Sequence, residues 1–146
     1  MQIDDHRQLA KETYGGTWEL LESARTPDQD LELLTRAFTS RYHWAVAGGA
    51  QEAVVSDWMV SRCLAAVGEG RLSLRFAEAA VAGLPDDSPA WLRASVEEGL
   101  ARAHAAVGDA VRREQHLVRA REILATEPDA EDRELIAAQI DDVPAV

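Results

Sequence analysis

The chain contains the stretch SRCLAAVGEG at residues 61–70, and a similar stretch, ARAHAAVGDA, follows at residues 101–110. Both contain an arginine, an Ala-Ala-Val-Gly run and an acidic residue, each displaced by 40 residues. Further on, Ala80 and Ala120 stand at the same displacement. Self-similarity at a fixed distance indicates a repeated structural unit. The chain therefore contains two copies of one structural unit, with Gly68 and Gly108 at the two turns.

The residues around these stretches predict helices. Apolar side chains recur every three or four positions, as at Leu31, Leu34 and Phe38, which gives a helix one buried face. No Asn-Gly or Asp-Gly hairpin turn occurs, and strand signals are nearly absent. A glycine permits a tight turn with a positive φ, and an alanine in the second helix lets two backbones approach closely. Each copy is therefore predicted to be a helical hairpin.

Capping signals divide the chain into successive helices. Thr26-Pro27 and Ser88-Pro89 have the pattern of a capping residue followed by proline in the first turn, and Asp129 caps the last helix. Glycines are expected to end several of the helices. The expected elements are a short helix or two between residues 4 and 24, then helices at about 27–47, 50–67, 71–83, 89–107, 109–125 and 129–141.

The first hairpin resembles a tetratricopeptide repeat. Gly68, Ala80 and Pro85 stand at the spacing of the turn glycine, the second-helix alanine and the terminal proline of that family. The second copy departs from the pattern, with Arg113 where a small residue belongs and Ala125 where proline is usual. Its displacement of 40 residues also exceeds the usual period of about 34. The resemblance implies an all-α fold of antiparallel hairpins, stacked as a short right-handed α-solenoid.

A second resemblance extends over most of residues 36–142. The run Arg41-Tyr42-His43-Trp44, followed by Trp58 and by Ser61-Arg62, is similar to a group of small bacterial tetratricopeptide-like proteins. That group brings no catalytic residues to carry over. We expect one domain over residues 1–146, with an N-terminal helical cap at 1–26, a hairpin core at 27–125 and a C-terminal capping helix and tail at 126–146.

Composition excludes several classes of function. The net charge of −11 repels a phosphate backbone, so nucleic acid is not an expected partner. The single cysteine, Cys63, permits neither an internal disulfide nor a Cys-rich zinc site. No long apolar run predicts a membrane helix, and the acidic start at Asp4-Asp5 is unlike a secretory signal. A cytoplasmic protein is expected.

Enzyme and cofactor signatures are missing from the sequence. It has no phosphate-binding glycine-rich loop with lysine, no Gly-x-Ser-x-Gly and no His-Glu-x-x-His. Its four histidines never fall three or four residues apart, as a metal pair on one helix requires: His6, His43, His104 and His116. No catalytic residue, metal ligand or cofactor is therefore predicted.

The repeat singles out one set of binding candidates. Arg62 and Arg102 occupy equivalent positions on the first helices of the two hairpins, and Trp58 and Glu98 lie one turn before them. In tetratricopeptide domains the first helices line a concave groove, where two guanidiniums would grip a partner's carboxylates. The alternative is intramolecular, with Glu98 paired to Arg102 and the Arg62 stem packed on Trp58.

A second set of candidates is concentrated in one third of the chain. His43 and Trp44 precede the Gly48-Gly49 turn, and Trp58 and Arg62 follow it. If their side chains converge, they would form a pocket for a small molecule or a minor catalytic site. The alternative for His43 is a structural role at the turn, and for the two tryptophans a place in the core.

The reading that the sequence favours is a protein-interaction module that binds a peptide or partner helix in a concave groove. A small-molecule pocket and a structural or regulatory subunit remain as alternatives. A short stack has exposed end faces, which favours a homodimer. The acidic segment 127–142 is expected to be a capping helix that docks through Leu135, Ile136 and Ile140.

Overall fold

The computed structural model describes all residues from Met1 to Val146 and contains seven α-helices and no strand, which confirms the predicted all-α class. Every expected helix from residue 27 onward begins and ends within one residue of its expected bounds. The helices are α1 (Ile3–Leu21), α2 (Pro27–Ala47), α3 (Ala50–Ala66), α4 (Gly70–Gly83), α5 (Ala90–Ala106), α6 (Ala110–Leu124) and α7 (Ala130–Asp141).

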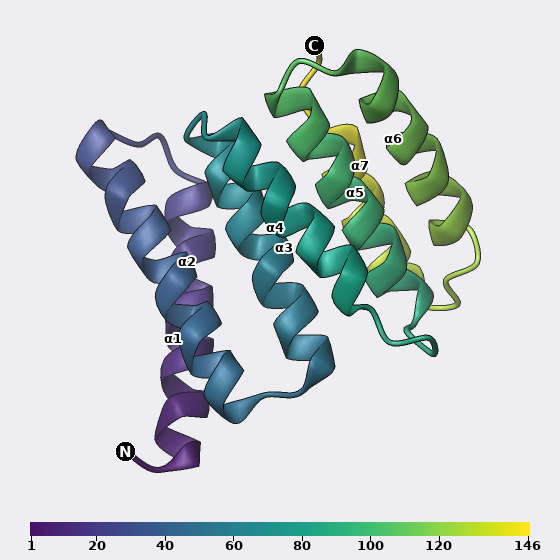
Figure 1. Cartoon of the computed structure of the whole chain (residues 1–146). Helices are drawn as coiled ribbons and strands as arrows, with labels where there is room; N and C mark the ends of the chain where they lie inside the picture. The colour runs from purple at the N-terminus through teal and green to yellow at the C-terminus, as the bar shows by residue number, and fades with distance from the viewer.

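Consecutive helices form pairs that lie side by side along the molecule (Figure 1). α1 packs on α2, α3 on α4 and α5 on α6, and α7 lies against α5 and α6. Contacts of α2 with α3 and of α4 with α5 join each pair to the next. α3 also contacts α5 directly, so the first helices of these two pairs are neighbours.

The two repeated turns have the same backbone structure. Gly68 has a φ of +87°, and the amides of Gly68 and Glu69 donate to the carbonyls of Ala65 and Leu64 at 3.2 and 2.9 Å. This is a Schellman motif, in which a residue in the left-handed region closes the end of a helix. The equivalent bonds recur after α5, where Gly108 has a φ of +81°. The positive φ predicted for both glycines is confirmed.

The capping signals predict one of the two proline-containing helix starts correctly and the other incorrectly. The Thr26 hydroxyl accepts from the Gln29 amide as predicted. The prediction that Ser88 caps the next proline start is wrong, because Pro89 is itself the N-cap residue of α5. The Ser88 hydroxyl instead donates to the Pro85 carbonyl at 2.6 Å and closes the preceding loop.

α1 is one continuous helix, although Gly15 and Gly16 lie within it. Hydrogen bonds dock it on α2: among them, the Ser40 hydroxyl donates to the Ala10 carbonyl at 2.8 Å, and Arg36 donates to the Gly16 carbonyl at 3.1 Å. A β-carbon at residue 16 would lie 3.1 Å from the Arg36 guanidinium. Glycine therefore leaves room for the arginine that fixes α1 and its aromatic side chains.

α5 lies at the centre of the hydrophobic core. One cluster of buried side chains joins it to α2, α3 and α4, and a second joins it to α6 and α7. Ala80 and Ala120 are both buried, in agreement with their predicted role at close helix contacts. Cys63 belongs to the first cluster, and burial raises the pKa of its thiol to about 12. None of the seven helices combines the length and the apolar composition that a membrane crossing requires.

The capping helix α7 docks through two of its three predicted side chains. Ile136 and Ile140 are buried at 5% and 1% exposure, whereas Leu135 is 60% exposed. Adjacent residues of a helix point about 100° apart, so Leu135 faces away from the contact that buries Ile136. The expectation for Leu135 is therefore corrected, and an uncovered apolar side chain remains on α7.

Arg113 explains one departure from the repeat pattern. It donates to the carbonyls of Pro144 and Val143 at 2.6 and 3.0 Å, and so holds the residues that follow α7. The equivalent residue of the first pair is Ser73, which exchanges hydrogen bonds with Ser61 on α3 at 2.8 Å. An arginine thus replaces the small residue at this position because its side chain holds the C-terminal segment that follows α7.

Candidate functional site

Four of the predicted site residues meet at one buried carboxylate. Glu98 on α5 has no exposed surface, and its Oε2 accepts from Trp58 Nε1 at 2.9 Å. Its Oε1 accepts from Arg62 at 3.2 Å and from Arg102 Nε at 2.8 Å. Charge-assisted bonds of this kind compensate the desolvation of a buried carboxylate. We refer to Trp58, Arg62, Glu98 and Arg102 as the Glu98 cluster.

The guanidinium of Arg62 is enclosed by aromatic rings. It lies over the rings of Trp18 and Trp58 at 5.2 and 5.9 Å, and its side chain is 10% exposed. Burial and then the charge of Arg102 lower the pKa of Arg62, while Glu98 raises it. An arginine remains protonated despite such a shift, so the cluster holds two cations and one anion.

The sequence left open whether Arg62 and Arg102 bind a partner or pair within the chain. Both intramolecular contacts are present, since Glu98 pairs with Arg102 and Arg62 stacks on Trp58. The two arginines do share one face, as their spacing predicts. They border a hollow of about 380 Å³ together with Arg25 and Asp142, and Asp142 lies 3.8 Å from Arg62. Their charges are nevertheless met from within the chain. An external carboxylate would have to compete with Glu98 and Asp142 for them.

His43 and Trp44 lie apart from this cluster. His43 Nδ1 is 2.8 Å from Nδ1 of His6, and this bond joins α2 to α1. One ring donates through its Nδ1 and the other accepts. The Trp44 carbonyl accepts from the Gly48 amide at the end of α2. Thus the four predicted residues, His43, Trp44, Trp58 and Arg62, do not converge on one pocket.

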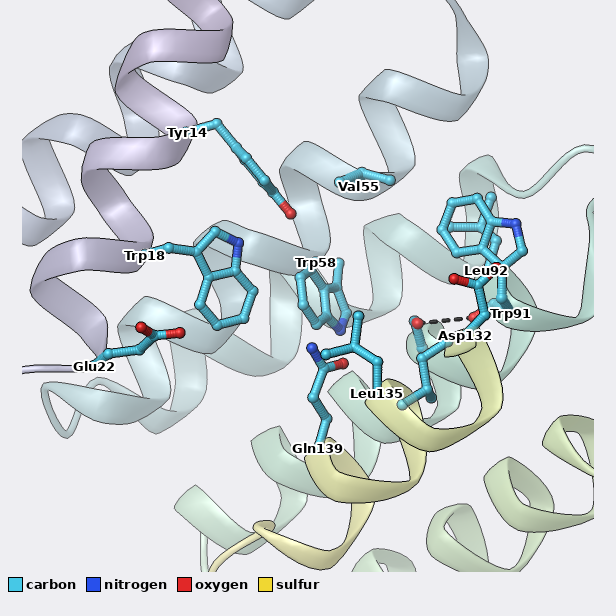
Figure 2. A pocket seen from close by; sticks show the side chains of 12 residues that line it. Tyr14, Trp18, Glu22, Val55, Trp58, Trp91, Leu92, Asp132, Leu135 and Gln139 are labelled. Atoms are coloured by element: carbon cyan, nitrogen blue, oxygen red, sulfur yellow. Dashed lines mark hydrogen bonds between the residues drawn. The ribbon is translucent and has the colours of Figure 1, made fainter. Parts of the chain in front are cut away.

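A different pocket lies beside the Glu98 cluster and has a volume of about 520 Å³. Its twelve lining residues come only from α3, α5, α7 and α1 with the residue that follows it. Figure 2 shows Trp18 and Trp58 side by side, with Leu135 of α7 across from them and Trp91 further along. The Trp18 and Trp58 ring centroids are 6.0 Å apart. We call this the aromatic pocket.

Trp58 belongs to both features. Its ring lines the aromatic pocket and its Nε1 bonds Glu98. The ring also lies on the backbone of α5, where a β-carbon at Gly99 would be 2.9 Å from Trp58 Cδ1. Glycine at residue 99 is what allows this close approach. The indole is thus fixed by Gly99, Glu98 and the neighbouring ring of Trp18.

The ionisable groups of the aromatic pocket are acidic. Glu22 and Asp132 line it, together with the phenol of Tyr14, and no arginine, lysine or histidine does. Burial raises the pKa of Tyr14, which keeps the phenol neutral. Desolvation, and then the charges of Asp129 and Glu127, raise the pKa of Asp132. A positive charge beside Asp132 would relieve this repulsion.

The 40-residue repeat extends to α1 and so predicts part of this pocket. The displacement of 40 residues also leads from Trp18 to Trp58, and from Glu22 to Arg62. α1 therefore shares the repeated face although its turn has no equivalent glycine. Trp91 has no such partner, because Gln51 stands at its equivalent position. Only the packing of α5 against α7 assigns it to the pocket.

The structure groups no three histidine, cysteine, aspartate or glutamate side chains where they could hold a metal ion. Similarity to known proteins gives no further assignment: no family model, no curated protein and no solved structure matches the chain. A function for the chain is therefore inferred only from the geometry of the aromatic pocket and of the Glu98 cluster.

Proposed function

We propose that the chain is a protein-interaction module that binds a segment of a partner protein across α1, α3, α5 and α7. The observation that carries the proposal is the aromatic pocket, because alternate helices alone line it. In a tetratricopeptide-like solenoid, the first helices of successive hairpins form the concave groove that receives peptides. The proposed fold is a short right-handed stack of this type, with α7 standing where the first helix of a further hairpin would be.

The surface of the pocket supports binding of a large apolar side chain. Leu135 is 60% exposed at the pocket, and Trp18, Trp58 and Trp91 line it. Exposed apolar surface that is hollowed and bordered by polar residues is typical of interaction sites, and aromatic residues dominate the affinity of such sites. A partner side chain placed between Leu135 and the tryptophans would remove this surface from water.

A small-molecule ligand is the second candidate, and the pocket volume favours it. About 520 Å³ lies within the range of cavities that hold small ligands, roughly 300–1,000 Å³. The position of the pocket at the surface, where Leu135 is 60% exposed, favours the peptide, because small-molecule sites enclose most of the ligand. The tryptophans that line this pocket are Trp18, Trp58 and Trp91. The small-molecule pocket predicted from the sequence was placed around His43, which does not line it.

A selection from a random peptide library tests the proposal. We expect the full chain to select peptides that bind it with micromolar affinity, and the Leu135→Ser variant to bind them about tenfold more weakly because an apolar contact is lost. Val111→Ser is the matched control, since Val111 is 69% exposed on α6 and does not line the aromatic pocket. Calorimetric titration measures both variants.

Two outcomes would overturn the peptide proposal. The first is that selected peptides bind Leu135→Ser and wild type equally, which would place their site elsewhere. The second is that no peptide is selected while small aromatic compounds saturate the pocket and quench its tryptophan fluorescence. That result would favour the small-molecule candidate instead.

A further inference from the structure

We infer that the partner segment is basic, with a large apolar side chain that enters the aromatic pocket between lysine or arginine residues that approach Glu22 and Asp132. The inference rests on the proposed function and adds the charge pattern of the partner. It is the opposite of the acidic partner that Arg62 and Arg102 suggest from the sequence.

The pocket lining carries only negative charge. Glu22 and Asp132 are its only charged residues. Neither forms an ion pair within the chain, in contrast to Glu98 and Asp57. Two unpaired carboxylates at an apolar pocket attract a ligand that brings positive charge.

These two carboxylates come from different elements. Glu22 follows the end of α1, and Asp132 lies in the first turn of α7. Figure 2 shows them at opposite ends of the group of side chains, with the rings of Trp18 and Trp58 between them. The surface is therefore negative, apolar and negative in turn. A basic, apolar and basic segment complements it.

The arginines of the Glu98 cluster are already paired within the chain. Arg62 and Arg102 both bond Glu98, and Asp142 lies 3.8 Å from Arg62. Arg62 is also shielded from the pocket, because its guanidinium lies over the rings of Trp18 and Trp58. An acidic segment would thus face the two carboxylates and meet no cation in the pocket lining, in a chain of net charge −11.

Three synthetic peptides test the inference. They share a central Leu-Leu-Ala-Leu-Leu core and differ only in two flanking residues on each side, which are Lys, Gln or Glu. Titration calorimetry with the full chain measures their dissociation constants at low and at physiological salt. We expect the Lys peptide to bind at least tenfold more tightly than the Gln peptide at low salt, with a smaller difference at physiological salt.

Charge-removing variants assign the effect to the two carboxylates. The double variant Glu22→Gln with Asp132→Asn should weaken binding of the Lys peptide by about three- to fivefold for each carboxylate, and leave the Gln peptide unchanged. Glu19→Gln with Glu134→Gln is the matched control. It removes the same charge from α1 and α7 at exposed residues that do not line the pocket. The control should retain the preference for lysine.

The outcomes separate the inference from the proposed function. Equal binding of the Lys and Gln peptides, with both weakened by Leu135→Ser, would overturn the inference and support the module. Tightest binding of the Glu peptide would also overturn it, and would direct attention to the hollow beside Arg62 and Arg102. If no peptide bound in a manner sensitive to Leu135→Ser, the proposed function would fail as well.

Discussion

The α3–α4 and α5–α6 pairs share one backbone plan and differ in chemistry at equivalent positions. Both end their first helix in the same Schellman turn. Yet Trp58 of the first pair corresponds to Glu98 of the second, and these two side chains bond each other. Arg62 and Arg102 also correspond, and both bond Glu98. The repeat therefore brings equivalent residues into contact. Where the two copies differ, as at Trp58 and Glu98, the two different side chains bond each other.

The largest expected effect concerns this difference directly. Glu98→Ala leaves Arg62 and Arg102 buried beside each other without their anion, and it removes the acceptor of Trp58. Breaking a buried ion pair on one side typically costs about 3–5 kcal/mol. We expect the free energy of unfolding to fall by that amount in urea denaturation.

Two further variants sharpen the comparison of the buried charges. Glu114→Ala, at an exposed carboxylate of α6, should change the free energy of unfolding by less than about 0.5 kcal/mol. Removing all three charges, as Arg62→Met, Glu98→Leu and Arg102→Met, should recover much of the loss. A Glu98→Ala protein as stable as the wild type would show that the two arginines do not depend on Glu98.

The next effect concerns Gly70, which corresponds to Ala110 in the second pair. A β-carbon at residue 70 would lie 2.7 Å from the carbonyl oxygen of Ala106, where α4 meets the end of α5. Backbone cannot move aside as a side chain does, so Gly70→Ala should cost about 1–3 kcal/mol. Thermal unfolding followed by circular dichroism measures the change. An unchanged melting temperature would show that α4 and α5 can separate there without loss.

A smaller and equal effect is expected at the two turns. Gly68→Val and Gly108→Val each force a β-branched residue to a φ of +87° or +81°, at a cost of about 1–2 kcal/mol. No atom beyond the neighbouring residues lies within 4 Å of either added β-carbon, so the backbone conformation is expected to dominate the cost. Urea denaturation should give similar losses for the two variants. Clearly unequal losses would contradict the equivalence of the two turns.

The smallest effect is a pH dependence that only the second pair has. His104 corresponds to Leu64, and burial followed by the charge of His116 lowers the pKa of His104 below its ordinary 6.5. The unfolded chain therefore binds this proton at a higher pH than the folded chain does. The contribution of His104 to stability is present above pH 6.5 and is lost as the pH falls below it.

His104→Leu gives the second pair the residue of the first. The fall in melting temperature between pH 7.5 and pH 5.5 should be smaller in this variant than in the wild type. The variant also removes His104 Nδ1, which is buried without a hydrogen-bond partner. An equal fall in both proteins would assign the pH dependence to other groups.

The fold was largely predictable because its signals are local. Thr26, Gly68 and Gly108 act within a turn of their own position, and they set helix ends to within one residue. The failure at Ser88 has a local cause as well, since the carbonyl of Pro85 offered its hydroxyl another partner. How the hairpins stack depends on contacts between distant residues, which capping signals do not contain.

The site was predictable only in part. The pairing of Glu98 with Arg102 follows from helical spacing, because residues four apart are neighbours on a helix. The bonds from Trp58 and Arg62 to the same carboxylate depend on the packing of α3 against α5. Trp91 joins the aromatic pocket through the docking of α7, for which no spacing rule exists.

The position of Trp58 has a consequence for the entropy of binding. Its indole is held by Glu98, by the backbone at Gly99 and by Trp18, so this wall of the pocket is rigid before any partner arrives. Ordering a free side chain on binding costs about 0.5–1.5 kcal/mol, a penalty that Trp58 avoids and the exposed Leu135 does not. The buried Glu98 carboxylate, which pairs with both arginines, thus also preorganises the surface on which a partner is proposed to bind.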